Sequence, residues 1–300
     1  MAISTYFKTD KVVSIEEFIA FVDENIDISD DDSVVSAGEM LQGLANNKDY
    51  LIDTFNRDLL KYGDSPTSSY SQSSAMLGTG KRKAFVVRAN MWPPSEKASL
   101  KSVEDLLFSY DLAHDHNFSF LTANYFGSGY ETDIWECANP EVLVGYEGEP
   151  VHLTFLEHTM LEPGKQMYFR RRKDIHIQHP PKDYSASLNL LIASKTDLVT
   201  DQFEYDVNSK TIKTFPKGTI ASRRAFFMEM AGAIGNQNTT DLLLKIAENH
   251  PCQRTRASAL KSAIQLNSSV LSHISPKVKD DPSPFIRAIL ENNSGNSPSS

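Results

Sequence analysis

The middle of the chain contains a series of short hydrophobic runs, separated by turn sequences. They read AFVVRANMW, FSFLTANYF, TDIWE, VHLTFLEH, QMYFRRR and SASLNLLIA, and a further run, FEYDVNSKTIKTF, follows with a turn near its centre. Runs of this length, rich in β-branched and aromatic residues and bounded by Gly and Pro, indicate strands. Many short strands in succession predict a β-sandwich or barrel. The expected fold is therefore mainly β, with α-helical parts on either side.

Both flanks of this β region have the apolar spacing of helices. Before it, Ser14 and Glu17 form a capping-box pattern ahead of FIAFV, and a second helical stretch is expected from about Val34 to Tyr62. After it, residues 222–266 are rich in Ala, Leu, Ile and Met at helical spacing. We therefore expect a helical N-terminal segment and linker (1–80), a β domain (81–218), a helical domain (219–292) and a disordered tail (293–300).

The C-terminal helical part carries a weak internal repeat. HPCQRTRA, which starts at His250, aligns with DPSPFIRA, which starts at Asp281. The proline of each copy suits the first turn of a helix, and helix pairs at a fixed period indicate a solenoid. The pattern resembles short HEAT-like repeats, and stacks of that kind form surfaces that bind protein partners.

Charge and composition exclude several functional classes. The chain has 39 acidic and 30 basic residues and a formal net charge of -9, so a general nucleic-acid-binding surface is not expected. Its two cysteines, Cys137 and Cys252, are too few for a disulfide scaffold or a four-cysteine zinc site. No secretory signal and no apolar run of the ~20 residues that span a bilayer is visible. We therefore expect a cytoplasmic protein that does not contact a membrane.

The histidines are concentrated in the β region. His114 and His116 form H-D-H, and side chains two residues apart on a strand point to the same face. Neutral imidazole nitrogens on one face can share a metal ion. A motif this short also occurs as two polar residues on a solvated strand face, and that alternative stays open. A third histidine, His176, lies 12 residues after Gly164 in the Pro-Gly turn.

The order of these histidines and turns resembles the cupin superfamily over about Lys81 to Ala193. The first cupin motif contains H-x-H and a later glycine, and the second contains a glycine turn followed by a histidine on a strand. The matching residues here are His114, His116, Gly127, Gly164 and His176. The resemblance implies a double-stranded β-helix, or jelly roll, with a bound metal ion.

The resemblance departs from the usual cupin ligand set at one position. The glutamate of the first motif falls on Phe120 or Leu121, and neither side chain binds metal. What remains is a three-histidine site (His114, His116 and His176) that looks like the one in the thiol dioxygenase branch, which implies Fe(II). Because imidazole also suits other metals, Ni, Cu, Zn and Mn remain alternatives. A fourth ligand could come from Glu136, Glu131 or His179.

Four further side chains are candidates for the reaction itself. Arg170 and Arg172 would share a face with His176 if the strand continues without a bulge, and they would then clamp a substrate carboxylate. The alternative is a solvated strand end or an ion pair. Tyr168 has the same parity and would donate a hydrogen bond. Asn189 stands where the thiol dioxygenase branch carries the histidine of its Ser-x-His pair.

Together these features predict a mononuclear non-haem metal enzyme, most simply an Fe(II)-dependent dioxygenase or hydroxylase. Three neutral ligands leave the charge of a dication uncompensated, which favours O₂ and a small anionic or peptide-linked substrate. Two alternatives remain. One is a cupin isomerase or decarboxylase that uses its metal as a Lewis acid. The other is a non-catalytic ligand sensor whose helical repeats bind a protein. The oligomeric state, with a homodimer among the alternatives, is left open.

Overall fold

The computed structural model describes residues 3–60, 73–94, 108–192, 199–216 and 219–294. By its internal contacts the chain divides into two compact units. The first comprises Met1–Glu141, Pro150–Ser194 and Glu204–Thr211, and the second comprises Val142–Glu149, Lys195–Phe203 and Ile212–Ser300. Within the described ranges, no helix combines the length and apolar character needed to cross a membrane.

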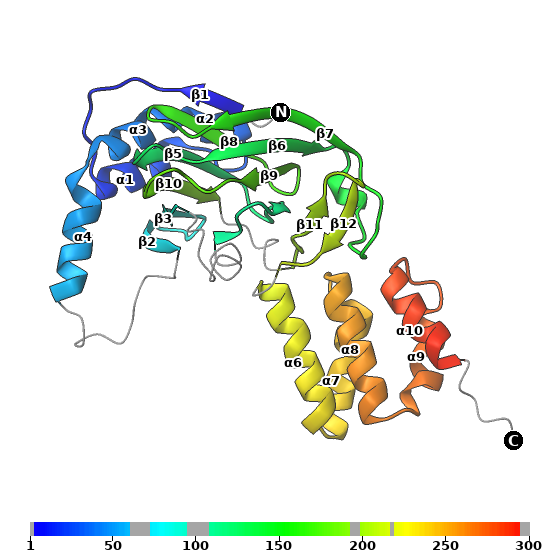
Figure 1. The fold of residues 1–300 in the computed structure, drawn as a ribbon. Helices are drawn as coiled ribbons and strands as arrows, with labels where there is room; N and C mark the ends of the chain where they lie inside the picture. Colours follow the sequence, from blue (N-terminus) through cyan, green and yellow to red (C-terminus); the bar gives the residue numbers. More distant parts are fainter. Residues whose placement is uncertain (1–2, 61–72, 95–107, 193–198, 217–218, 295–300) are drawn as a thin grey trace, which may run out of the picture. The chain divides into compact units, whose positions relative to one another are not determined.

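The structure contains two six-stranded antiparallel sheets (Figure 1), whose strands belong to the first unit except for most of the last one, Thr211–Thr214. The first sheet has the order β1-β8-β5-β10-β3-β2, with β1 (Ile3–Tyr6), β2 (Ser74–Thr79), β3 (Phe85–Trp92), β5 (Phe120–Phe126), β8 (Lys165–Phe169) and β10 (Ser185–Ile192). The second has the order β12-β11-β4-β9-β6-β7, with β4 (Ala113–His114), β6 (Glu131–Cys137), β7 (Leu153–Met160), β9 (Asp174–Gln178), β11 (Glu204–Asp206) and β12 (Thr211–Thr214). The prediction of a β domain made of many short strands is confirmed. Strand β1, which pairs with β8, was not predicted.

The described residues ahead of β2 contain the helices α1 (Ile15–Asn25), α2 (Asp31–Ser36), α3 (Gly38–Asn46) and α4 (Asp49–Leu60). The capping box at Ser14 and Glu17 is present. The stretch predicted as one helix is three, because the chain turns at Ala37 and again at Asn47. At the second turn, the hydroxyl oxygen of Tyr125 lies 2.9 and 2.7 Å from the carbonyl oxygens of Asn47 and Lys48, and its single hydrogen donates to one of them at a time.

Alternation along the strands of the first sheet separates two cores. Val87, Leu121 and Leu188 belong to one cluster, which they share with side chains of α1 and α3. Residues at alternate positions point to the other face. There Phe120 and Phe169 cluster with Ile134 of the second sheet. The space between the two sheets is therefore the interior of the unit, and the helices cover the outer face of the first sheet (Figure 1).

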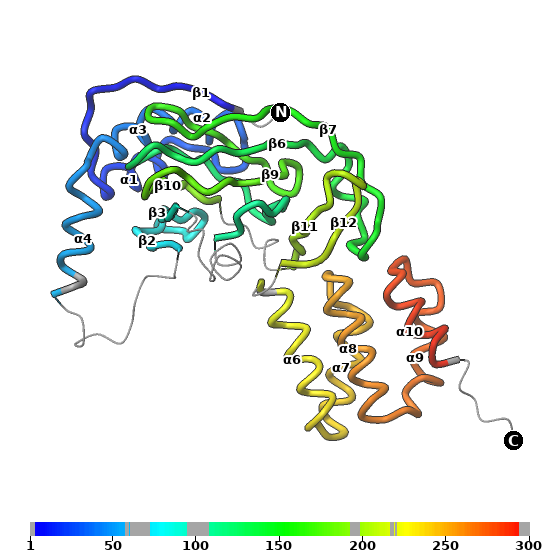
Figure 2. Tube along the Cα trace, viewed as in Figure 1, coloured from blue at the N-terminus to red at the C-terminus, as the bar shows by residue number. Residues whose placement is uncertain are grey.

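The second unit contains helices that follow one another along the chain (Figure 2): α6 (Ile220–Ile234), α7 (Gln237–Asn249), α8 (Gln253–Leu266), α9 (Val270–Val278) and α10 (Pro284–Ser294). They have a core of their own, which includes Leu243, Leu260 and Ile286. The 31-residue offset in the sequence corresponds to the starts of α8 and α10. HEAT-like character remains a prediction, since helix succession alone does not define that repeat.

Two predicted segments fall partly outside the described residues. The linker expected at the end of the 1–80 segment coincides largely with 61–72. Of the predicted tail, 295–300 lie outside, whereas Asn293 and Ser294 are still part of α10. The helix therefore extends slightly beyond the predicted domain end.

Candidate metal centre

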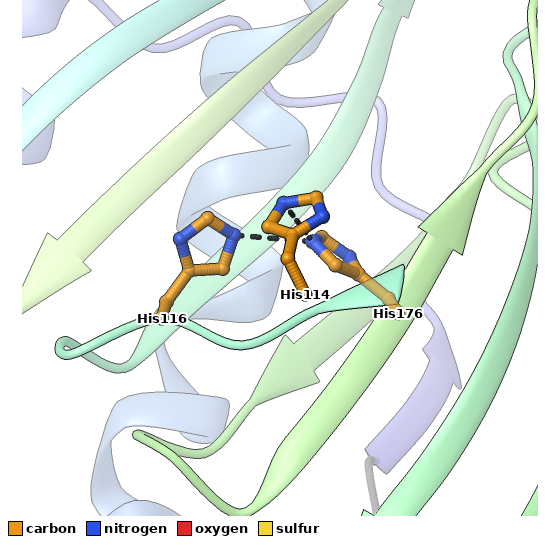
Figure 3. Close-up of side chains that lie close together, drawn as sticks. All are labelled: His114, His116 and His176. Carbon is orange, nitrogen blue, oxygen red and sulfur yellow. Dashed lines mark hydrogen bonds between the residues drawn. The ribbon is translucent and has the colours of Figure 1, made fainter. Parts of the chain in front are cut away.

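Three histidines of the first unit meet in the space between the sheets (Figure 3). His114 ends β4 and lies directly opposite His176 of β9 in the antiparallel register. Strand β4 stops at His114, so His116 follows it rather than lying within it, and the backbone N–H of Arg172 donates to the His116 carbonyl at 2.7 Å. His114 and His176 are buried and His116 is partly buried. The residues predicted as metal ligands are thus brought together by two backbone segments, residues 114–116 and β9.

The three rings present the same atom, Nε2, to a common point. Nε2 of His176 lies 3.1 Å from Nε2 of His116 and 3.1 Å from Nε2 of His114. At a metal–nitrogen distance of about 2.1 Å, two ligand nitrogens lie about 3.0 Å apart at an angle of about 90° and about 3.4 Å apart at about 109°. The donor atoms therefore already have the separation expected of ligands to one ion.

The protonation state of the rings also suits a cation. Nδ1 of His114 lies 2.9 Å from the carbonyl oxygen of Leu112, and because a carbonyl only accepts, this nitrogen carries the hydrogen. The Nε2 lone pair of neutral His114 is then directed at its neighbours. Burial lowers the pKa of His114, and burial together with the neighbouring imidazoles holds the pKa values of His116 and His176 well below 6.5. All three rings are neutral at pH 7.

Hydrogen bonds do not satisfy this cluster. If Nε2 of His176 carries a hydrogen, that hydrogen points at only one of its two neighbours. If it carries none, it faces the bare Nε2 of His114 with two lone pairs 3.1 Å apart. Its other nitrogen, Nδ1, is buried without a hydrogen-bond partner among the described residues. A cation at the common point would satisfy both contacts at once.

Aromatic side chains surround the imidazoles. The ring centroids of Phe118 and Phe120 lie 4.8 and 5.0 Å from that of His116, and the Phe169 centroid lies 4.8 Å from that of His176. Such an apolar shell excludes water and lowers the local dielectric, which strengthens electrostatic interactions at the centre.

The interior face of the first sheet adds a polar wall. The register places Asn189 between Arg88 of β3 and Thr122 of β5. Two buried atoms on this wall, Arg88 Nε and Asn90 Oδ1, have no hydrogen-bond partner among the described residues. Buried polar atoms are rarely left unpaired, so these two suggest a ligand or ordered water.

Arg88 is the most informative member of that wall. Burial lowers the pKa of its guanidinium to about 10, and within the described part of the chain no carboxylate forms an ion pair with it. Its charge helps to lower the pKa of His116, so it lies within electrostatic range of the centre. Arg88 was not among the residues predicted from the sequence. The signal was available, because Arg88 and Asn90 place two polar groups on one face of an otherwise apolar run.

Two of the four residues predicted to act on substrate, Tyr168 and Arg170, have partners away from the three histidines. Strand β8 ends at Phe169 and a turn with Arg172 at φ +57° precedes β9, so the condition under which Arg170 and Arg172 would share a face with His176 is not met. Tyr168 belongs to the core shared with the helices, and its hydroxyl donates to Asp31 at 2.6 Å. Tyr168 therefore lies on the opposite face of the sheet from the histidines.

Arg170 has carboxylate partners of its own. Its guanidinium donates to Asp174 through Nε and Nη2 at 2.9 and 2.6 Å, and to Glu136 at 2.6 Å. The pKa of Arg170 is raised, mostly by the hydrogen bond to Asp174 and to a smaller extent by the one to Glu136. Arg170 thus forms the ion pair that the sequence left as an alternative. Asn189 does face the interior, where its amide donates to the Arg88 carbonyl at 3.3 Å.

None of the candidate fourth ligands joins the three histidines in the described structure. Glu136 is paired with Arg170. His179 belongs instead to a second group of side chains, together with Asp133 and His158, and Glu131 lies near His158 of that group. Among the described residues, the centre is therefore a three-histidine cluster without a carboxylate.

Comparisons with known proteins give fold-level similarities at most. No family model and no curated protein matches the chain. Among solved structures, salicylate 1,2-dioxygenase from Pseudoaminobacter salicylatoxidans with gentisate is 8% identical over 57% of this chain and 36% of that chain, with a TM-score of 0.29. The DMSP lyase DddQ from Ruegeria pomeroyi is 13% identical over 53% of this chain and 60% of that chain, with a TM-score of 0.26.

A cupin 2 domain-containing protein from Halorhodospira halophila is 10% identical over 49% of this chain and 76% of that chain, with a TM-score of 0.26. The chain spans less than two thirds of the dioxygenase and of the lyase. TM-scores this low say nothing about the chemistry of the centre. The geometry of the three histidines is itself that of a candidate metal site.

Proposed function

We propose that the first unit is a cupin-type jelly roll and that His114, His116 and His176 hold one divalent metal ion in its interior. The observation that carries this is the pair of 3.1 Å contacts among three buried or partly buried, neutral Nε2 atoms that hydrogen bonds cannot satisfy. The proposed activity is that of a non-haem iron dioxygenase or hydroxylase. Ferrous ion bound there would supply the oxygen chemistry, while the protein supplies geometry and electrostatics.

The substrate is proposed to be a small anion, such as a carboxylate. Three neutral ligands do not offset the charge of a dication, and the Arg88 guanidinium on the facing wall has no carboxylate partner among the described residues. A buried cation of this kind is stabilised by an anionic ligand. Arg88 would therefore orient the anion, with Thr122 and Asn90 as further hydrogen-bonding groups.

The remaining residues of the site exclude water and fix the ligands. Phe118, Phe120 and Phe169 pack against the imidazoles. The Leu112 carbonyl fixes the tautomer of His114, and the Arg172 backbone holds the segment of His116. The C-terminal helices are proposed to bind a protein partner, as their resemblance to repeat stacks implies.

Metal content and oxygen consumption test this proposal. Chelator-treated protein is loaded with Fe(II) without oxygen, desalted and measured by elemental mass spectrometry. The His114→Ala/His176→Ala variant is expected to hold one equivalent less than wild type. A matched control, His152→Ala, changes an exposed histidine outside the cluster and should leave iron content unchanged.

The loaded protein is then screened with small carboxylates in an oxygen electrode. Uptake that depends on both substrate and the three histidines supports an oxygenase. Substrate turnover without oxygen uptake would contradict the oxygenase proposal and favour an isomerase or a decarboxylase. Equal iron content in wild type and the double variant would refute the metal centre itself.

A further inference from the structure

A second group of metal-ligating side chains lies on the other face of the second sheet. Asp133, His158 and His179 each offer one ligand atom, and these atoms all lie within 4.8 Å of one another. We call these three residues the outer-face cluster. Asp133 lies between Thr132 and Ile134 on β6, both fully buried on the interior face, so its own side chain points outward.

The strand register brings the members together. Asp133 pairs with His158 of β7 on one side and with Ile177 of β9 on the other. His179, two residues after Ile177, returns to the same face. Its backbone N–H donates to the Glu131 carbonyl at 2.8 Å, which fixes it beside β6 although β9 has ended. Three neighbouring segments thus each contribute one ligand from a hydrogen-bonded scaffold.

The contacts within the cluster are short and directed at one carboxylate. Nδ1 of His158 lies 2.6 Å from Oδ1 of Asp133, and Nε2 of His179 lies 3.1 Å from its Oδ2. Two more carboxylates are near. Glu131 is 3.8 Å from Nε2 of His158, and Asp111 is 2.7 Å from Nδ1 of His179. The cluster and its surroundings therefore contain three carboxylates and two imidazoles. When the imidazoles are neutral, this region has an excess of negative charge.

We propose that the outer-face cluster is a second metal site, which binds a divalent cation of the zinc class through His158, His179 and Asp133. Two imidazoles and one carboxylate are a ligand set that zinc takes in proteins. The Asp111 carboxylate on the far nitrogen of His179 is the partner that commonly orients a metal-bound histidine. This site does not depend on the interior centre.

The position of the cluster indicates a structural or regulatory cation. The side chains of His158, Asp133 and His179 are 54%, 26% and 30% exposed, so a cation can reach them from solvent. Bound there, it would tie β7, β6 and the end of β9 together and offset the surplus negative charge. Only small side-chain movements would bring ligand atoms already within 4.8 Å to coordinating distances.

Zinc titration of the full chain tests the site. Chelator-stripped protein is titrated with Zn²⁺ against an indicator dye, and zinc retained after gel filtration is measured. In the His114→Ala/His176→Ala background, which removes the interior ligands, we expect one bound zinc per chain. Adding His158→Ala, or the isosteric Asp133→Asn, should remove it or weaken it at least tenfold, whereas adding His152→Ala should not.

A second comparison avoids reliance on that background. In otherwise wild-type protein, His158→Ala/His179→Ala should lower the zinc content by one equivalent and leave the iron content attributed to the interior histidines unchanged. The proposal is overturned if wild type and this double variant bind the same amount of zinc with the same affinity. It is equally overturned if the protein lacking the interior ligands is folded, by circular dichroism, and binds no zinc.

Discussion

The second sheet carries one histidine cluster on each face, and the two differ in almost every physical respect. Strand β9 and its end supply both, with His176 pointing inward and His179 outward. The inner cluster has three neutral imidazoles and aromatic neighbours, and no carboxylate of the described part of the chain belongs to it. The outer one has two imidazoles, nearby carboxylates and solvent access. The face of the sheet on which a histidine lies, more than its residue type, therefore decides its chemical environment.

The largest expected difference between the clusters is in catalysis. Under the proposed function, His114→Ala/His176→Ala should reduce substrate-dependent oxygen uptake by at least about 10³-fold, since loss of metal ligands removes the chemistry itself. His158→Ala/His179→Ala should stay within about twofold of wild type, because a cation there does not meet substrate. Initial rates of oxygen consumption at saturating iron measure both. Similar losses in the two variants would erase the distinction between the faces.

The aromatic residues of the two faces should differ in stability. Phe169 is 1% exposed between the sheets, whereas Phe155 on β7 is 48% exposed. Phe169→Ala should lower the free energy of unfolding by about 3–5 kcal/mol through the lost transfer energy and the cavity. Phe155→Ala should cost less than about 1 kcal/mol, as exposed positions usually do. Urea unfolding followed by circular dichroism gives both values, and equal costs would mean that the interior is not packed as described.

Replacement of Arg88 tests whether the inner cluster works with an anion. Arg88→Gln should raise KM for a carboxylate substrate about 10–100-fold, because a charged hydrogen bond contributes about 1.5–3 kcal/mol. Arg88→Lys should restore part of the affinity, since it keeps the charge but loses the fork geometry. Metal content should not change in either variant. An unaltered KM in Arg88→Gln would assign substrate orientation to another group.

The smallest expected effects are on the pH dependence of stability in chelator-treated protein, and here the clusters have opposite signs. Burial would lower the pKa of His179, but hydrogen bonds to Asp111 and Asp133 outweigh it and raise the pKa. The stability that protonated His179 adds to the folded protein is therefore present below about pH 6.5. It is lost as the pH rises through the pKa that His179 has in the folded protein. The inner histidines have lowered pKa values, so they destabilise the folded state as the pH falls below about 6.5.

Two single variants separate these contributions. His179→Ala should cost less than about 1 kcal/mol at pH 6, the range of partly exposed ion pairs, and still less at pH 8. His116→Gln should flatten the loss of stability below pH 6.5. Urea midpoints measured from pH 5 to pH 8 with chelator present give both profiles. A larger cost of His179→Ala at pH 8 than at pH 6 would contradict the assigned ion pairs.

The local elements and the residues proposed as metal ligands can be recognised in the sequence without the structure. The capping box at Ser14 starts a helix as expected, the short runs between turns form strands, and His114, His116 and His176 meet. The capping box, the strands and the H-x-H pair are encoded locally, in side-chain period, turn residues and spacing, whereas His176, 60 residues after His116, was predicted from the resemblance to cupins. Local signals survive in a single sequence because they depend on neighbours only a few residues apart.

Which side chains face the three-histidine cluster follows only from the tertiary structure. A turn at Arg172 breaks the strand and directs Arg170 to Asp174 and Glu136, and Tyr168 faces the helices instead of the site. The same packing leaves Arg88 on the inner wall without a carboxylate partner among the described residues. A single-residue change of register moves a side chain to the other face of a sheet. Sequence parity therefore fails wherever a turn intervenes, and the partner strands settle which face is buried.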